Sequence, residues 1–221
     1  MSNCVASREA EQELREEQQV SFSPVKPGGK KVYRALKRCI DFILALNAVV
    51  FLSLPLLLIG ILIRLDSPGP AIFKQPRMGQ NGKTFMIYKF RTMRMDAPPE
   101  LATRRFRNSD EYITKLGAFL RRTSLDELPQ LWNILRGEMS FVGYRPVCLS
   151  EEDLNDLRME YGVFQIRPGL TGYAQIQGRD DLEYRRKAVL DAEYVQRQSF
   201  KLDIWCLLKT VTVVFSGEGA K

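Results

Sequence analysis

The sequence predicts a mainly helical α+β protein with an N-terminal re-entrant membrane helix, a small β-hairpin and amphipathic helices at a membrane interface. Three observations support this fold class. An uncharged apolar run extends from Phe42 to Ile63, an Asn81-Gly82 pair separates two β-prone segments, and apolar residues recur at helical spacing in the second half of the chain. The 221 residues leave room for one main domain and its appendages.

The apolar run from Phe42 to Ile63 is longer than the roughly 18 residues that indicate a membrane helix. The alternative, a buried core helix, needs more surrounding protein than this chain offers. Pro55 predicts a kink within the run, with Ser53 two positions before it. Both flanks are basic, and basic flanks favour the cytoplasmic side. We therefore expect a helix that is broken at Ser53 and Pro55 and that enters and leaves the membrane by one face.

The chain is basic, with 33 Lys and Arg against 26 Asp and Glu and a net charge of +7. This balance favours anionic partners such as phospholipid head groups, phosphorylated substrates or nucleic acid. The basic run at 26–38 directly precedes the membrane segment, which indicates contact with an anionic lipid bilayer. Basic and acidic residues are interspersed elsewhere and no nucleic-acid-binding motif is evident, so we expect no nucleic-acid partner.

Residues 1–30 lack apolar periodicity and predict a disordered arm, and their polar start predicts no cleavable signal peptide. The four cysteines (Cys4, Cys39, Cys148 and Cys206) are far apart and form no CxxC motif. We therefore expect free thiols in a reducing compartment rather than a zinc ribbon or a redox motif.

The segments 71–73 and 84–90 are β-prone, and the Asn81-Gly82 pair between them is typical of a hairpin turn. The second segment leads into Lys89, Arg91 and Arg94, which either face an anion or form a solvated basic surface. Helical spacing of apolar residues then predicts a helix over 111–122.

The stretch from Arg121 to Pro146 places Asp126 and Glu127 side by side among arginines that include Arg145. The chain has no histidine, so carboxylates, Lys, Cys, Tyr, Ser or a metal-bound water must carry any proton transfer or nucleophilic attack near neutral pH. This pattern favours phosphate chemistry, in which arginines bind the anion while a carboxylate holds a metal or attacks.

A structural alternative exists for the same pair. Ser124 and Glu127 have the spacing of a helix capping box, and Pro129 fits the start of a helix. The two interpretations are compatible, because a helix N-terminus also offers free N–H groups to a phosphate. With arginines nearby, we expect the Asp126 carboxylate to stay ionised.

Three later segments each allow two interpretations. The glycines of 167–179 either cradle a phosphate or form a plain turn-rich loop. The helix predicted at 183–198 is highly charged, and Asp191 within it is either functional or part of a solvated face. Apolar spacing and Trp205 predict that 200–216 is an amphipathic helix at a membrane interface, with a core helix as the alternative.

Several motifs of this chain resemble those of one family. The stretch 121–146, the KFRTM run at 89–93 and RPGLTGYAQ at 167–175 occur in the order found in bacterial sugar transferases called monotopic phosphoglycosyl transferases. The resemblance extends from residue 34 to residue 215. It implies transfer of a sugar-1-phosphate from a nucleotide sugar, a UDP-sugar in our prediction, to polyprenyl (undecaprenyl) phosphate with release of UMP. This step initiates a bacterial surface glycan such as a capsule, exopolysaccharide, O-antigen or glycoprotein.

The resemblance also assigns roles to residues of this chain. It implies that Asp126 is the nucleophile that forms a covalent phospho-sugar intermediate and that Glu127 is its partner. It further implies a Mg²⁺ cofactor held by Asp126 and, with less support, by Asp191. The substrate phosphates and nucleotide would contact four basic side chains: Lys89, Arg91, Arg145 and Arg179.

The family implies a monotopic protein on the cytoplasmic face of the bacterial inner membrane, and it leaves open a homo-oligomer. Accordingly, we predict a basic arm (1–33), a re-entrant membrane helix (34–64), a cytosolic catalytic domain (65–199) and an interfacial helix (200–216).

The chain departs from the family pattern at Leu54, which interrupts a Ser-Pro pair, and at Tyr144, where proline is usual. The sequence does not specify the sugar or the glycan pathway. A membrane-anchored adaptor remains an alternative, in which Asp126 and Glu127 only cap a helix.

Overall fold

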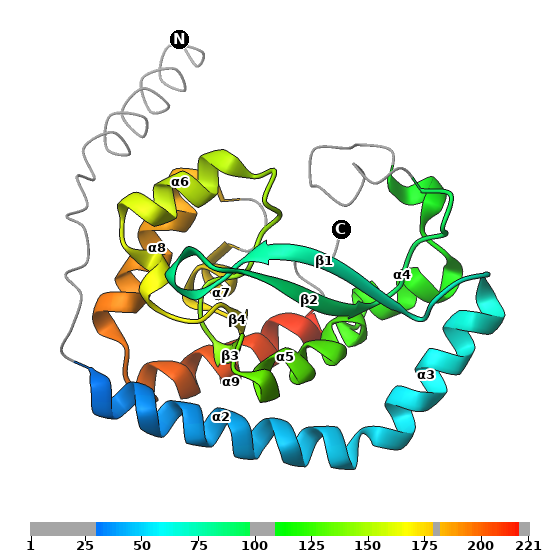
Figure 1. The fold of residues 1–221 in the computed structure, drawn as a ribbon, viewed down its shortest axis with the longest axis horizontal. Coiled ribbons are helices and arrows are strands. Elements are labelled where there is room, and N and C mark those ends of the chain that lie inside the picture. The colour runs from blue at the N-terminus through cyan, green and yellow to red at the C-terminus, as the bar shows by residue number, and fades with distance from the viewer. Residues whose placement is uncertain (1–29, 98–108, 179–181, 217–221) are drawn as a thin grey trace, which may run out of the picture.

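A computed structural model describes residues 30–97, 109–178 and 182–216, and within them the protein is mainly helical with two small sheets (Figure 1). The α+β class is therefore confirmed. Most of the predicted basic arm and Arg179 lie outside the described residues. The helices are α2 (Lys31–Phe51), α3 (Ser53–Asp66), α4 (Lys115–Arg122), α5 (Leu131–Arg136), α6 (Glu152–Glu160), α7 (Tyr173–Gly178), α8 (Tyr184–Arg197) and α9 (Phe200–Ser216). The strands are β1 (Ile72–Met78), β2 (Thr84–Phe90), β3 (Ser140–Val142) and β4 (Gly169–Thr171).

Helices α2 and α3 form a bent pair along one side of the molecule, with an angle of 63° between them (Figure 1). Within the described residues, neither helix alone has the length and apolar composition of a membrane span, whereas the two together do. The bend lies at Leu52, next to the predicted break at Ser53 and Pro55. Pro55 cannot donate the backbone hydrogen bond that would join it to Phe51, which explains a break one turn before the proline.

The predicted hairpin is confirmed. Strands β1 and β2 pair antiparallel from Ile72 opposite Phe90 to Met78 opposite Thr84. Asn81 and Gly82 adopt left-handed conformations at the turn, with φ of 58° and 72°. The first strand extends five residues beyond the predicted 71–73, because Pro76 is tolerated on an edge strand.

Strands β3 and β4 form a short parallel pair, which explains the glycines of 167–179. A Cβ atom on Gly172 would lie 1.9 Å from the backbone oxygen of Gly143, and one on Gly169 would lie 2.1 Å from the Gly143 nitrogen. These glycines therefore allow two backbones to approach closely. The alternative of a plain turn-rich loop is wrong, since the segment forms β4 and α7.

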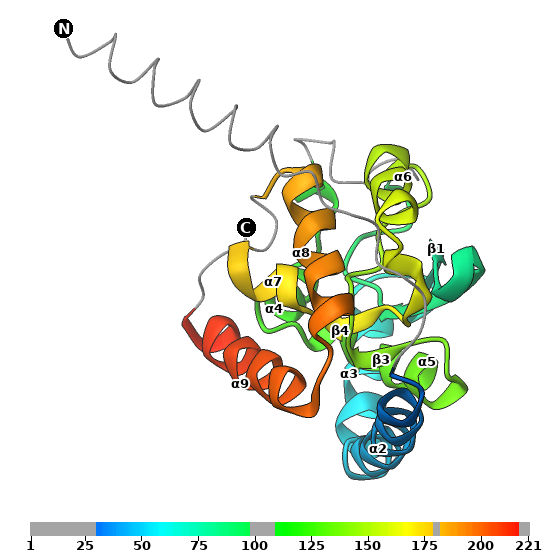
Figure 2. The ribbon, with the colours of Figure 1, turned by 90° about the vertical axis from the view of Figure 1, so that its left-hand side faces the viewer.

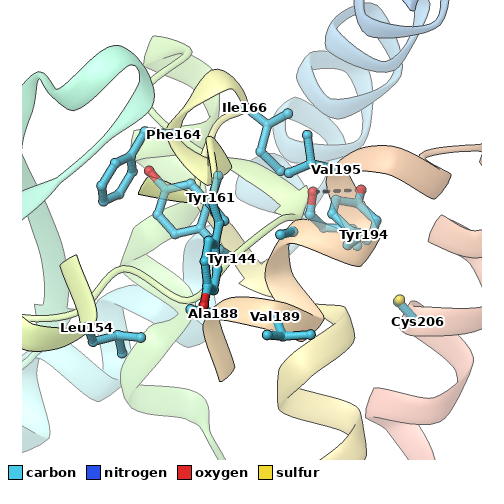
Figure 3. Close-up of a cluster of buried hydrophobic side chains, with 13 residues drawn as sticks. Tyr144, Leu154, Tyr161, Phe164, Ile166, Ala188, Val189, Tyr194, Val195 and Cys206 are labelled. Carbon is cyan, nitrogen blue, oxygen red and sulfur yellow. Dashed lines mark hydrogen bonds between the residues drawn. The ribbon is translucent and has the colours of Figure 1, made fainter. Parts of the chain in front are cut away.

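The main apolar core lies between β3, α6, α8 and α9, and Figure 3 shows part of it. Tyr144 is only 1% exposed and packs edge-on against Phe164, with 5.3 Å between the ring centroids. Helix α8 contributes Ala188, Val189 and Tyr194. The interpretation of α8 as a solvated charged helix is therefore wrong for most of its length.

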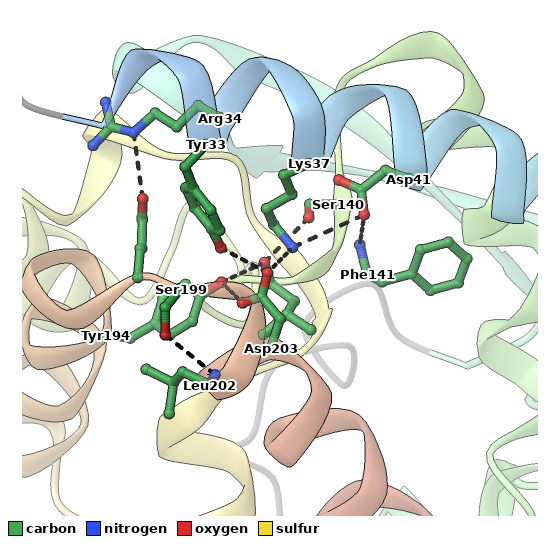
Figure 4. Close-up of polar contacts among 12 residues, drawn as sticks. Tyr33, Arg34, Lys37, Asp41, Ser140, Phe141, Tyr194, Ser199, Leu202 and Asp203 are labelled. Carbon is green, nitrogen blue, oxygen red and sulfur yellow. Dashed lines mark hydrogen bonds and ion pairs between the residues drawn. The ribbon is translucent and has the colours of Figure 1, made fainter.

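A polar network joins α2 to α8 and α9 (Figure 4). Asp203 of α9 accepts hydrogen bonds from the hydroxyls of Tyr33 and Tyr194, each at 2.6 Å, and pairs with Lys37 at 2.9 Å. Burial and the neighbouring Asp203 charge raise the pKa of Tyr194 well above its ordinary value. Helices α2 and α9 consequently lie on the same side of the molecule (Figure 2).

We expect Asp203→Ala to weaken this junction, since it leaves Lys37 and two tyrosine hydroxyls without their acceptor. Losing one partner of a buried ion pair costs about 3 kcal/mol, which corresponds to a fall in Tm of about 6–12 °C in a chain of this size. Thermal unfolding in detergent measures the shift. Asp156→Ala, on the exposed surface of α6, is the control. Equal Tm values for the two variants would contradict this role of Asp203.

Candidate active site

Asp126 and Glu127 lie on a short 3-10 helix, η4 (Leu125–Gln130), that packs against β2. The capping box predicted as an alternative does not form. Ser124 has a left-handed backbone with φ of 57°, and its side chain makes no cap hydrogen bond. The Glu127 side chain instead turns toward two basic groups. The adjacent carboxylates are therefore not explained by helix capping.

Glu127 joins three segments that are distant in the sequence. Its Oε1 accepts a hydrogen bond from Lys89 Nζ of β2 at 2.8 Å and another from the Arg145 guanidinium, in the loop after β3, at 2.9 Å. Only 14% of the Glu127 side chain is exposed. Burial alone would raise the pKa of Glu127, but the charges of Arg145 and Lys89 outweigh it and hold that pKa well below its usual range. Glu127 therefore remains a carboxylate.

The pKa of Asp126 is shifted in the opposite direction. Burial, and next the adjacent Glu127 charge, raise the pKa of Asp126, while Lys89, Arg145 and Arg121 lower it by less. The sequence predicts that the nearby basic groups dominate, but Glu127 already takes Lys89 and Arg145 as its hydrogen-bond donors. The two neighbouring carboxyl groups therefore differ, because the pKa of Asp126 is raised while that of Glu127 is lowered.

The position of Lys89 is fixed by Asn133 of α5. This side chain is fully buried, donates to the Met86 oxygen at 2.7 Å and accepts from the Tyr88 nitrogen at 3.1 Å. Asn133 therefore bonds to the edge of β2 that β1 leaves open, as a neighbouring strand would. This places the end of β2, and Lys89 with it, against η4.

The structure does not bring Arg91 to the carboxylate pair. The Arg91 guanidinium donates to the backbone oxygens of Pro68, of Ser67 at 2.7 Å and of Ile63 at 3.2 Å. It thereby satisfies carbonyls at the C-terminal end of α3 and in the turn that follows. The predicted phosphate contact is replaced by a structural role, since Arg91 is only 6% exposed.

Asp191 is likewise apart from the pair. It is buried in α8, where its Oδ2 accepts two hydrogen bonds from Arg158 of α6, at 2.6 and 2.9 Å. The sequence gives no sign of a role for Arg158, because one arginine in a charged helix has no distinguishing pattern. Arg158 also donates to the backbone oxygen of Arg145 at 2.9 Å, so it contacts the loop whose Arg145 side chain bonds to Glu127.

A large groove opens beside the carboxylate pair, between the bent α2–α3 pair, the hairpin and the start of α5. Its volume is about 1210 Å³. The groove borders two elements of the site, since Leu128 and Pro129 of η4 and Tyr88 and Phe90 of β2 are among its lining residues. The lining is mostly apolar with two basic side chains: Val49, Leu56, Leu57, Arg64, Pro68, Gly69, Pro70, Ala71, Ile72, Lys74, Tyr88, Phe90, Leu128, Pro129, Leu131 and Trp132.

The donor set near Asp126 matches one mode of magnesium binding. In the described part of the chain, no three His, Cys, Asp or Glu side chains gather in a metal-binding group. Mg²⁺ in phosphate-transfer sites commonly uses one or two carboxylates and completes its coordination with water and substrate phosphates. Asp126 fits this mode, because Glu127 and not Asp126 is committed to Lys89 and Arg145.

The family model of the bacterial sugar transferases matches residues 32–217, which is most of the chain. The chain belongs to the bacterial sugar transferase family. It is 41% identical to the UDP-glucose:undecaprenyl-phosphate glucose-1-phosphate transferase of Escherichia coli K12, over 86% of this chain and 42% of that protein. It is 39% identical to a transferase of the same name from Caulobacter vibrioides, over 89% of this chain and 77% of the relative.

A third relative of this sugar transferase is the exopolysaccharide production protein ExoY of Sinorhizobium fredii. The two are 39% identical over 83% of this chain and 87% of ExoY. The chain thus spans most of the shorter relatives but less than half the length of relatives such as the E. coli protein.

In this sugar transferase, we expect Arg91→Met to lower the Tm by at least about 5 °C, because it leaves buried carbonyls without a donor. Arg94→Met is the control, since the Arg94 side chain is 51% exposed and its ion pair with Asp96 is at the surface. That control should stay within about 2 °C of the wild type. A folded Arg91→Met protein with an unchanged Tm and lost activity would instead support the predicted phosphate contact.

Proposed function

We propose that this chain transfers a sugar-1-phosphate from a UDP-sugar to polyprenyl phosphate and releases UMP. The arrangement of the carboxylate pair carries the proposal: Glu127 neutralises Lys89 and Arg145, while Asp126 keeps a raised pKa beside them. Relatives named for glucose and galactose transfer to a lipid carrier support the donor and acceptor classes.

The reaction proceeds in two displacements. A carboxylate oxygen of Asp126 attacks the phosphorus that bears the sugar, and the bond to UMP breaks with its electron pair leaving on UMP. The sugar phosphate is then esterified to Asp126. An oxygen of polyprenyl phosphate attacks the same phosphorus, and the Asp126 carboxylate leaves. The products are UMP and a polyprenyl diphosphate sugar, so no oxidant or reductant is needed.

The basic side chains stabilise the charge that develops during each displacement. Arg145 and Lys89 both contact Glu127 and lie in the field of Asp126, so a phosphoryl group on Asp126 meets fixed donors. Donors that are positioned beforehand need little reorganisation in the transition state. When bound, Mg²⁺ would neutralise the donor diphosphate, with one Asp126 oxygen as a ligand. Arg179 remains a predicted contact to the nucleotide.

The apolar groove supports a polyprenyl acceptor. An isoprenoid chain needs an apolar surface, and its phosphate needs basic groups within reach of Asp126. The groove supplies an apolar lining, and Arg64 and Lys74 are basic side chains within it. We assign the acceptor chain to this groove, with its phosphate directed toward η4.

We also propose that the protein is monotopic on the cytoplasmic face of the inner membrane. Large apolar side chains are exposed along α2, α3 and α9, including Phe51 at 80%, Leu65 at 77% and Leu208 at 63%. These helices lie on one side of the molecule (Figure 2). Burial of that side in the head-group region would present the groove to a lipid-borne acceptor and would help to start a surface glycan.

Asp126→Asn should lower UMP release at least about 1,000-fold without loss of folding, because an amide cannot serve as the nucleophile. The measurement is UMP release by detergent-purified protein with Mg²⁺, polyprenyl phosphate and UDP-glucose or UDP-galactose. Asp156→Asn, on exposed α6, is the control. Equal release by Asp126→Asn and wild type would exclude Asp126 as nucleophile, and no release by wild type from any UDP-sugar would contradict the donor class.

Leu57→Gln should raise the KM for long-chain polyprenyl phosphate about 10-fold, because it places an amide in the apolar groove. Leu62→Gln is matched to it, since Leu62 is an exposed leucine of α3 that does not line the groove. Steady-state kinetics with C55 and C10 acceptors measure the effect, which should be small for the short acceptor. Equal KM changes in both variants would place the acceptor chain elsewhere.

A further inference from the structure

The loop that carries Arg145 is held in place by a buried charge pair behind the active site. We propose that Arg158 and Asp191 are positioning residues that aim Arg145 at Glu127. This inference rests on the proposed function, because it concerns the same site. It gives Asp191 a role other than the metal contact that the sequence resemblance implied.

Three successive residues after β3 have their backbones fixed. The Gly143 nitrogen donates to the Thr171 oxygen at 2.9 Å, and the Tyr144 oxygen accepts from the Gly169 nitrogen at 2.8 Å. These two bonds come from β4 and hold only the first part of the loop. The Arg145 oxygen accepts from Arg158 at 2.9 Å, and this third bond comes from α6. Arg158 therefore fixes the backbone of the residue whose side chain reaches Glu127.

Arg158 is itself held rigidly. Its side chain is 2% exposed, as is that of Asp191, and the two are joined through two hydrogen bonds of 2.6 and 2.9 Å. The guanidinium also lies over the Tyr144 ring, 5.1 Å from its centroid. A guanidinium with three directed donors and an aromatic contact has almost no rotational freedom. The guanidinium consequently holds the Asp191 carboxylate and the Arg145 backbone oxygen at fixed positions relative to each other.

Removing the charges of Arg158 and Asp191 from water costs free energy, which indicates that a contribution to stability alone does not account for this buried pair. A buried ion pair is often no more stabilising than apolar residues of similar volume, because both charges lose water. Burial also acts against the charge of Asp191, whose pKa is raised even though Arg158 and then Lys187 oppose the shift. What the pair provides is geometric, namely a donor aimed at the Arg145 oxygen from within the core.

Positioning matters here because Arg145 serves two functions. It neutralises Glu127, and it is the donor that a phosphoryl group on Asp126 would meet. A shift of about 1 Å in such a group can lower a rate about 100-fold. The pair should therefore affect turnover more than donor binding, since Arg145 acts most strongly where charge develops.

The test uses the double variant Arg158→Met/Asp191→Leu, which removes both charges and leaves neither buried alone. Exposed Arg186→Met on α8 is the control. We expect the double variant to remain folded, with kcat lowered about 30-fold and the KM for the UDP-sugar changed less than about 3-fold. In an Arg145→Ala background the same double change should lower kcat less than about 3-fold, because its effect passes through Arg145. Equal losses in both backgrounds would overturn the proposal.

Hydrogen–deuterium exchange gives a readout that needs no activity. The peptide that covers residues 143–148 should exchange faster in the double variant, while the hairpin turn at 79–83 should not change. Uniform acceleration across both peptides would show a global loss of stability and contradict the positioning role. Should wild-type protein release no UMP, the proposed function fails while exchange still decides whether Arg158 and Asp191 hold this loop.

Discussion

The candidate site depends on the Glu127 carboxylate held between Lys89 and Arg145. Lys89 comes from the end of a hairpin strand, Glu127 from a 3-10 helix and Arg145 from the loop after β3, so one buried carboxylate joins three distant segments. Because Glu127 accepts both basic groups, Asp126 is left with burial and a like charge as its main influences. One ion cluster thus gives two neighbouring acids different environments: two basic groups hold Glu127, while the pKa of Asp126 is raised.

Several arginines support this cluster from outside by donating to backbone carbonyls. Arg38 of α2 donates to the Ile134 and Leu135 oxygens at the end of α5. Arg91 does so at the end of α3, Arg158 at Arg145, and Arg167 at Gly137. Guanidinium groups suit this work because they offer several donors in a fixed plane. Part of the positive charge of the chain therefore holds the scaffold together and does not face an anion.

Predictions from this sequence succeed where a local pattern sets the structure and fail where tertiary packing chooses the partner of a charged side chain. The hairpin and the helix at 200–216 follow from local patterns, because a turn pair and an apolar period are visible in the sequence. The roles predicted for Arg91 and Asp191 rest on the family resemblance and not on a local pattern of this chain. Their partners, the end of α3 and Arg158, are set by tertiary packing that no local pattern encodes.

The capping box shows that a local pattern can also predict a contact that does not form. Ser124 and Glu127 have the correct spacing, yet Ser124 takes a left-handed backbone and Glu127 finds stronger partners in Lys89 and Arg145. A charge-assisted contact in a buried site outweighs a cap of about 1 kcal/mol. The site thus overrides the local preference of its own sequence, as functional sites commonly do.

The proposed mechanism requires that Asp126 attacks the donor before any acceptor is present. The most direct test is exchange of radiolabelled UMP into a UDP-sugar, with Mg²⁺ and without polyprenyl phosphate. We expect exchange by the wild-type protein and none by Asp126→Asn. Sugar transfer to polyprenyl phosphate without any such exchange would contradict it, because the sugar phosphate would then pass directly from donor to acceptor.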